Sequence, residues 1–504
     1  MGETWAKVRV AGHRAEVVGV DLYLDLSGTR VRAGLEGALR DAVRAGRLHP
    51  GTRLPSSRAL AADLGIARNT VAEVYSQLVA EGWLTAQTGA GTSVAPHRPP
   101  APGAAVAARP AEPVPRYDLR AGVPDLSAFP RRAWLATARR VLAAAPDHLL
   151  GYPDPRGLPQ LRTALADYLA RARGVTADPA RIVVCAGFAH GLAGISRALR
   201  ATGAATLAVE AYGHQAHRDI AAVQGLRLRP LPVDGMGAVI GRAAGADAML
   251  LTPAHQFPLG VTLHPRRRRE AADWGGVVIE DDYDGEFRYD RQPVGALQTL
   301  APDRVIYAGT ASKSLAPSLR LGWLVVPPHL LDPVTAELAA GPSALDQLTL
   351  AEFITSGGYD RQVRRARLAY RRRRDRLAAA LHRRRLRVTG IAAGLHAVLE
   401  LPGTSLEQAA LSRAGQHGLA IEGLGSYRAG RTGPDDGRGD RAGLVIGYGR
   451  PPEHAYTTAL ARLCAILPPE LLPPHGPMGA GGSSEAASRN GMTAFGRSGE
   501  KKMS

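Results

Sequence analysis

The chain has 504 residues, of which 45% are hydrophobic and 21% are charged. A chain of this length typically forms two or three domains. It contains no apolar run of 18 residues and starts with a mixed polar segment, so we expect neither a membrane span nor a secretory leader. Because Cys185 and Cys464 are the only cysteines, a disulfide framework and a four-cysteine zinc site are excluded. We expect a cytoplasmic protein.

Lysine is almost absent although the chain is basic. The 63 Lys and Arg residues outnumber the 45 Asp and Glu residues, which gives a formal net charge of +18. Between residues 8 and 500, Lys313 is the only lysine. A site that needs only positive charge can use arginine, whereas a site that needs an amine to attack a carbonyl group cannot. Lys313 is therefore a candidate nucleophile, and chance retention is the alternative.

Three short helices and a hairpin are predicted within residues 20–95. The first helix contains Leu35, Leu39 and Val43; the second opens at residues 54–58, where a serine is a good N-cap. A third helix over residues 68–81 carries one apolar stripe, and residues 83–94 form the hairpin. This order is that of a winged helix-turn-helix, whose third helix would offer its N-terminus to DNA. A helical module for binding other proteins is the alternative.

Beyond this unit the composition changes twice. Residues 96–116 are rich in Pro and Ala and read as an extended linker. Residues 117–472 alternate helical and strand-like segments, which predicts an α/β domain around a mostly parallel sheet. Its candidate strands are residues 182–185, 205–209, 248–251, 277–279 and 305–307. Residues 473–504 are rich in Gly and Ser and are predicted to be disordered.

Chemically distinctive residues follow several of these strands. Asp281 and Tyr283 come directly after residues 277–279, and Lys313 follows residues 305–307 with Arg320 seven positions later. A glycine-containing loop at residues 186–190 follows another strand and opens a helix. An amine, an acid, a phenol and several phosphate ligands together form the set that pyridoxal 5′-phosphate (PLP) requires.

These motifs resemble two known families. Residues 22–94 resemble the GntR-type DNA-binding domain, on the segments PGTRLPSSR at residues 50–58 and EGWL at residues 81–84. Residues 117–467 resemble fold-type I aminotransferases, which are PLP-dependent and have a small C-terminal α+β subdomain. The combination resembles the MocR subfamily of bacterial transcriptional regulators. The resemblance implies a homodimer that binds spaced DNA half-sites.

The resemblance assigns roles to matching residues. Lys313 would bind the PLP aldehyde as an imine, Asp281 would pair with the pyridine nitrogen, and Tyr283 would hydrogen-bond the ring hydroxyl. The phosphate would be surrounded by Gly187, Phe188, Thr310, Ser312 and Arg320. Tyr152 would reach the phosphate in the neighbouring subunit. The DNA-contacting positions would be Arg53, Ser56, Arg58, Arg68, Asn69, Thr70 and Gly89.

Four positions depart from the family pattern. The ring-stacking tyrosine falls on His214, with Tyr212 as an alternative. Residues 255–260, HQFPLG, lack the asparagine of the aminotransferase motif. Val445 stands where aminotransferases place the arginine that grips the substrate carboxylate. Ala67 stands where Ser or Thr often caps the recognition helix, which loses about 1 kcal/mol of capping.

The missing arginine decides between the function hypotheses. Transamination needs a bidentate guanidinium to orient the substrate carboxylate, whereas cofactor binding does not. We therefore expect a DNA-binding regulator that senses PLP or its adduct with an amine. An active aminotransferase with a DNA-binding domain is the rival, because Lys313, Asp281 and Tyr283 are intact. A cofactor-free scaffold is disfavoured by the retained lysine.

An arginine-rich segment and the spacing of the histidines give two further expectations. Residues 361–387 carry 13 Arg and one Asp, which fits either a solvated helix face or a basic track for DNA. The histidines are scattered without metal-ligand spacing, so we expect no metal site.

Overall fold

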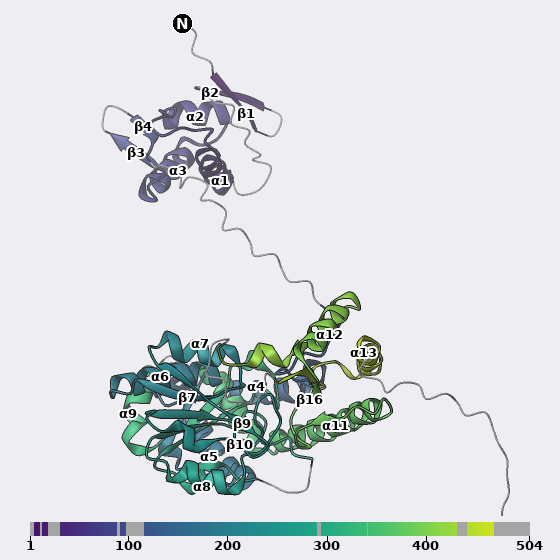
Figure 1. The fold of residues 1–504 in the computed structure, drawn as a ribbon. Helices are drawn as coiled ribbons and strands as arrows, with labels where there is room; N and C mark the ends of the chain where they lie inside the picture. Colours follow the sequence, from purple (N-terminus) through teal and green to yellow (C-terminus); the bar gives the residue numbers. More distant parts are fainter. Residues whose placement is uncertain are drawn as a thin grey trace, which may run out of the picture. The chain divides into compact units, whose positions relative to one another are not determined.

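The structure is a computed structural model, and it describes residues 5–10, 13–18, 31–87, 91–96, 115–289, 294–339, 341–430 and 441–467. The chain divides into two units, Met1–Pro113 and Val114–Ser504 (Figure 1). The expected tail at residues 473–504, most of the expected linker and Gly89 lie outside the described residues. In the described part, no helix has the length and apolar character needed to cross a membrane.

The first unit contains the predicted helices and hairpin. Its elements are a strand pair, β1 (Trp5–Val10) and β2 (His13–Val18), then α1 (Val31–Arg44), α2 (Ser57–Leu64), α3 (Arg68–Ala80), β3 (Leu84–Gln87) and β4 (Gly91–Val94). The predicted stripe of α3 is buried at Val71, Val74, Tyr75 and Leu78. It packs against leucines of α1 and α2 in one core, which leaves the opposite face of α3 to solvent.

The ends of α2 and α3 are capped differently. The Ser56 Oγ accepts a hydrogen bond from the Ala59 N–H at 3.2 Å, and Gly65 ends α2 with a φ of 64°. Ala67 occupies the N-cap of α3 and supplies no side-chain hydrogen bond. The first turn of α3 therefore keeps backbone N–H groups without a side-chain partner from its N-cap residue.

This difference predicts opposite effects for two substitutions. A67S should slow amide exchange in the first turn of α3 about fivefold, since a new cap adds about 1 kcal/mol. S56A should speed exchange at the start of α2 by a similar factor. Hydrogen–deuterium exchange of the full-length protein measures both effects, and an A67S protein with unchanged α3 protection would contradict the assignment.

The second unit is built on a seven-stranded sheet. The strand order is β6-β14-β13-β12-β11-β7-β8, and all neighbours are parallel except at β14, which is antiparallel to β13 and β6. The strands are β6 (Ile182–Cys185), β7 (Thr206–Glu210), β8 (Arg227–Leu231), β11 (Ala248–Leu251), β12 (Val277–Asp281), β13 (Val305–Thr310) and β14 (Gly322–Val325). The expectation of a mostly parallel sheet is confirmed.

Helices cover both faces of this sheet (Figure 1). One layer contains α6 (Phe188–Ala201), α7 (Gln215–Val223) and α9 (Pro328–Glu337). The other contains α5 (Pro159–Arg173), α8 (Pro265–Asp273) and α10 (Ala344–Thr355). Consecutive strand residues alternate between the two layers: Val183 packs with the first and Val184 with the second. Because both faces are buried, the strands read as continuous apolar runs.

A smaller subdomain follows the long helix α11 (Gly358–His382). Its antiparallel sheet has the order β15-β16-β19-β18. The elements are β15 (Val388–Thr389), β16 (His396–Leu401), α12 (Thr404–Gln416), β18 (Glu422–Gly423), β19 (Ala442–Gly447) and α13 (Glu453–Ile466). One apolar core joins this sheet to α11, α12 and α13, which gives the α+β subdomain that the family resemblance implies.

Candidate functional site

A cavity of about 320 Å³ lies at the carboxyl edge of the large sheet. In parallel strands these ends meet at one edge, where ligands of α/β proteins bind. Nine of the ten sequence-predicted cofactor residues line the cavity: Gly187, Phe188, His214, Asp281, Tyr283, Thr310, Ser312, Lys313 and Arg320. The tenth, Tyr152, is fully exposed and lines a separate hollow beside Leu150 and Pro153.

Lys313 presents its amine at the wall of this cavity. Its Nζ donates a hydrogen bond to the backbone carbonyl of Gly122 at 2.6 Å. Burial lowers the pKa of the Lys313 amine, and the charges of Asp281 and Asp284 oppose this shift. A lowered pKa increases the fraction of neutral amine, which is the nucleophilic form. The carbonyl of Gly122 was not predicted, since nothing in the sequence of a loop 191 residues away marks it.

Four carboxylates follow one another at residues 280, 281, 282 and 284, and only one of them lines the cavity. The Asp282 Oδ2 accepts a hydrogen bond from the Arg173 Nε at 2.6 Å and another from the Tyr307 hydroxyl at 2.7 Å. Glu280 accepts backbone N–H groups at the start of a neighbouring loop. These two acids therefore serve the fold, and Asp281 is the one that a ligand can meet.

The environment of Asp281 favours a cationic partner. Burial raises the pKa of the Asp281 carboxyl well above its usual range, the nearby acids Asp282, Asp284 and Glu210 raise it further, and Lys313 opposes the shift. A buried carboxylate is stabilised when a cation is brought beside it. A protonated ring nitrogen is such a cation.

Another part of the cavity wall is suited to an anion. Helix α6 starts after Gly187, whose φ is 86° and which supplies no side-chain cap. A Cβ added to Gly187 would lie 3.5 Å from the Arg320 guanidinium, so the backbone and this cation are close neighbours. The hydroxyls of Thr310 and Ser312 lie 2.8 Å apart on the same wall. A helix N-terminus with a guanidinium and hydroxyls is a typical phosphate cradle.

The structure distinguishes the two candidate stacking residues. The His214 ring lines the cavity and stacks on His217, with ring centroids 5.0 Å apart and an interplanar angle of 25°. Tyr212 is 9% exposed and belongs to an apolar cluster with Phe257, and it is not part of the cavity wall. His214 is therefore the residue positioned to face a ring in the cavity.

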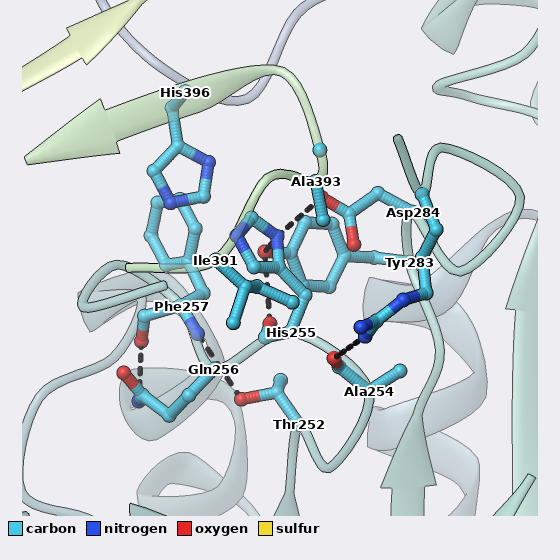
Figure 2. A network of polar contacts seen from close by, with 12 residues as sticks. Thr252, Ala254, His255, Gln256, Phe257, Tyr283, Asp284, Ile391, Ala393 and His396 are labelled. Atoms are coloured by element: carbon cyan, nitrogen blue, oxygen red, sulfur yellow. Dashed lines mark hydrogen bonds and ion pairs between the residues drawn. The ribbon is translucent and has the colours of Figure 1, made fainter. Parts of the chain in front are cut away.

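Behind the cavity wall lies a polar network around His255 (Figure 2). The His255 Nδ1 lies 2.8 Å from the Asp284 Oδ2 and 3.1 Å from the Tyr283 hydroxyl. That hydroxyl donates a hydrogen bond to the His255 carbonyl at 3.0 Å. Burial and the nearby acids Asp284 and Asp281 raise the pKa of Tyr283 well above its usual range. The network holds Tyr283 as a neutral phenol against the cavity.

The same network is a geometric candidate for metal binding that sequence spacing did not indicate. The ligand atoms of His255, Asp284 and His396 lie within 4.8 Å of one another. Each side chain already has a protein partner, since the His396 Nε2 lies 3.0 Å from the Pro258 carbonyl oxygen. We interpret the cluster as a hydrogen-bonded support for Tyr283, and the absence of a metal stays a prediction.

Val445 lies in the middle of β19, opposite Val398 of β16. It is fully buried in the apolar cluster that contains Phe257, Leu424 and Tyr427. This position therefore supplies no guanidinium. Arg218 of α7 also lines the cavity. The sequence did not indicate this residue, because no motif distinguishes it from the many other arginines.

The sequence-predicted DNA-contacting residues gather on the helix-turn-helix. Arg58, Arg68 and Asn69 are exposed, and Thr70 is half-buried. Arg53 packs beside Gly91 of the hairpin and shares a shallow hollow with Ser56. The start of α2 and the start of α3 thus present polar side chains to solvent, whereas Gly89 lies outside the described residues.

Most of the arginines at residues 361–387 are exposed, but Arg373 is not. The Arg373 side chain is 2% exposed; its Nη2 contacts Asp125 at 2.7 Å and its Nε contacts Glu453 at 2.8 Å. This arginine joins α11 to its neighbours. A test of the DNA-track interpretation must therefore leave Arg373 in place and replace exposed residues such as Arg371 and Arg372.

Fold and site together define a two-part protein, a helix-turn-helix unit followed by an aminotransferase domain. The sequence matches "Bacterial regulatory proteins, gntR family" over residues 32–94 and "Aminotransferase class I and II" over residues 117–435. A solved archaeal alanine:glyoxylate aminotransferase shares the fold of the second part, with a TM-score of 0.62, 24% identity and coverage of 70% of this chain and 91% of that one.

Two transcriptional regulators are also similar to this chain. The HTH-type pyridoxine biosynthesis transcriptional regulator PdxR of Corynebacterium glutamicum is 34% identical, covering 86% of this chain and 95% of the relative. The probable rhizopine catabolism regulatory protein MocR of Rhizobium meliloti is 35% identical, covering 69% and 76%. The chain belongs to the MocR-like subfamily of GntR-family transcriptional regulators.

The separate roles of neighbouring acids predict separate mutant phenotypes. D282N should lower the free energy of unfolding of the second unit by about 3–5 kcal/mol, because it leaves the buried Arg173 guanidinium without its charge partner. D281N should cost about 1 kcal/mol or less, because burial already disfavours the charged form of Asp281. Urea unfolding of the cofactor-free protein measures both, and equal losses would refute the distinction.

Proposed function

We propose that this regulator binds PLP in the cavity at Lys313 and senses either PLP or its adduct with an amino compound. The observation that carries the proposal is that one cavity is lined by a buried amine, a buried acid and the helix N-terminus, guanidinium and hydroxyls that suit a phosphate. When bound, PLP supplies an aldehyde that condenses with amines and a ring that withdraws electrons.

The residues of the cavity fit the parts of this cofactor. Lys313 would hold the aldehyde end, and Asp281 would hold a protonated ring nitrogen. Tyr283, kept neutral by its surroundings, would donate to or accept from the ring hydroxyl. His214 would cover one face of the ring. The start of α6 with Arg320, Thr310 and Ser312 would hold the phosphate.

Aminotransferase activity is the second candidate, favoured by the intact set of Lys313, Asp281 and Tyr283. Efficient turnover also requires that the substrate carboxylate be oriented. Val445 is buried among apolar side chains and cannot do this. We therefore expect slow or absent conversion of PLP to its amine form in single-turnover spectra with a panel of amino acids; rapid conversion would favour the enzyme.

We further propose that the regulator acts as a cytoplasmic homodimer on spaced DNA half-sites. The segment before the large sheet exposes several apolar side chains: Leu126, Leu135, Leu142 and Leu150. Tyr152 shares a hollow with Leu150 and is fully exposed, away from the cavity of its own chain. Several large exposed apolar side chains along one segment support an interface there, and Tyr152 would then complete the phosphate site of the partner.

The cofactor proposal predicts the position of a covalent label. Borohydride reduction of the PLP-loaded protein should fix the cofactor on the peptide that contains Lys313, and mass spectrometry locates it. K313A should abolish the label, whereas PLP should still associate reversibly through the phosphate cradle. A label on another residue, or a label that persists in K313A, would refute the assignment.

The DNA proposal predicts a difference between the two ends of α3. N69A should weaken binding to the upstream promoter about tenfold or more, because each good base contact contributes about 1–3 kcal/mol. R44Q is the matched control. The guanidinium carbon of Arg44 lies 5.2 Å from the ring centroid of Trp83. Trp83 follows the C-terminal end of α3, whereas Asn69 lies at its N-terminal end. Electrophoretic mobility shifts at fixed salt compare them, and equal affinities would exclude Asn69 from base recognition.

A further inference from the structure

Residues 119–124, which we call the strap, run along the cavity wall without helix or strand structure. The strap is fixed at both ends. The Leu119 N–H donates to the Ala420 carbonyl at 2.8 Å, and the Leu119 carbonyl accepts from the Gly447 N–H at 2.7 Å. Directly after the strap, the buried Asp125 carboxylate contacts a guanidinium of α11 at 2.7 Å. Both ends are therefore tied to the small subdomain and its long helix.

The middle of the strap has a single polar contact. The Lys313 Nζ donates to the Gly122 carbonyl at 2.6 Å. Within the described residues, no other hydrogen bond holds the backbone of Ala121, Gly122 or Val123. Gly122 has a φ of 91°, which favours glycine, and a Cβ added there would meet nothing within 4 Å. The glycine thus satisfies a backbone requirement at the one point where the strap meets the amine.

The number of N–H bonds on Lys313 depends on what its nitrogen is bonded to. Condensation of a neutral amine with an aldehyde forms a C=N bond, and the two amine protons leave with the aldehyde oxygen as water. The nitrogen then keeps at most one N–H and is fixed by the ring, so the Gly122 carbonyl loses its donor. When a second amine attacks the same carbon, its two protons pass to the Lys313 nitrogen as the C–N bond to lysine breaks. The donor to Gly122 is then restored.

The strap also lies close in the chain to the connection between the two units. Only β5 (Tyr117–Asp118) separates it from the predicted linker at residues 96–116. We propose that the strap reports the covalent state of Lys313: a free amine holds it closed through Gly122, and an amine bonded to the cofactor aldehyde releases it. The inference rests on the proposed PLP site and adds how that site is coupled to the chain that leads to the DNA-binding unit.

Limited trypsin digestion of the full-length protein tests this at the Arg120–Ala121 bond of the strap. Cleavage follows the population of the opened strap when closing is faster than cutting. Mass spectrometry quantifies the peptide that ends at Arg120. Added PLP should speed this cut about fivefold or more, as expected for the loss of one hydrogen bond. Methoxyamine, a small amine without a carboxylate, condenses with the PLP aldehyde in place of Lys313 and should return the rate to that of the PLP-free protein.

K313R and K313A are the matched variants. K313R keeps N–H donors, but its guanidinium stays protonated and forms no C=N bond, so cleavage should stay slow with or without PLP. K313A removes the donor, so cleavage should stay fast in every state. A general tightening of the fold by a bound ligand would slow the cut, which is opposite to the result expected for the wild type. An unchanged or slower cut in the PLP-loaded wild type, no recovery with methoxyamine, or a PLP-dependent rise in K313R would overturn the inference.

Failure of the inference is distinguishable from failure of the proposed function. A wild-type protein that takes up no PLP and shows no borohydride label at Lys313 refutes the proposed function itself. A wild-type protein that acquires the label while the cut at Arg120 keeps its PLP-free rate leaves the proposed function intact and refutes only the role of the strap.

Discussion

The site depends on the parallel pairing of β11, β12 and β13. Asp281 pairs with Ala308, and Glu280 with Leu251, so the three strands end at one edge of the sheet. Residues that follow these ends lie close together although they are far apart in sequence. The acid at the end of β12 and the amine beyond β13 meet at one cavity for this reason. A shift of one residue in this register would turn Asp281 away from the cavity and Asp282 towards it.

Because successive residues of β12 and the following loop point in different directions, the neighbouring aspartates have different surroundings. Asp282 pairs with Arg173 in the α5 layer, whereas Asp281 lines the cavity. Asp284 supports Tyr283 through His255. Within four residues, identical chemical groups therefore pair with a buried arginine, line the cavity and support Tyr283. The buried charges that serve the fold are paired, and the one at the cavity, Asp281, is left to meet a ligand.

The absence of an arginine at position 445 would let an aminotransferase fold serve as the proposed sensor. With Val445 buried in an apolar cluster, the cavity lacks the grip that orients a substrate for proton transfer. A site can then recognise an amino compound without turning it over. In the proposed sensor, binding energy would change the protein rather than lower a reaction barrier.

The sequence by itself determined the division into a helix-turn-helix and an α/β domain, the main strands, and the group of Lys313, Asp281 and Arg320. These follow from local periodicity, cap residues and motif spacing, which are properties of short segments. Only the tertiary structure decided that His214 rather than Tyr212 lines the cavity, that Arg373 is buried between α11 and its neighbours, and that Arg218 donates to the Tyr427 carbonyl. These depend on which distant side chains and carbonyls fill the neighbouring space, and contacts such as that of Arg218 with Tyr427 span 209 residues. Burial and pairing across such separations have no local signal.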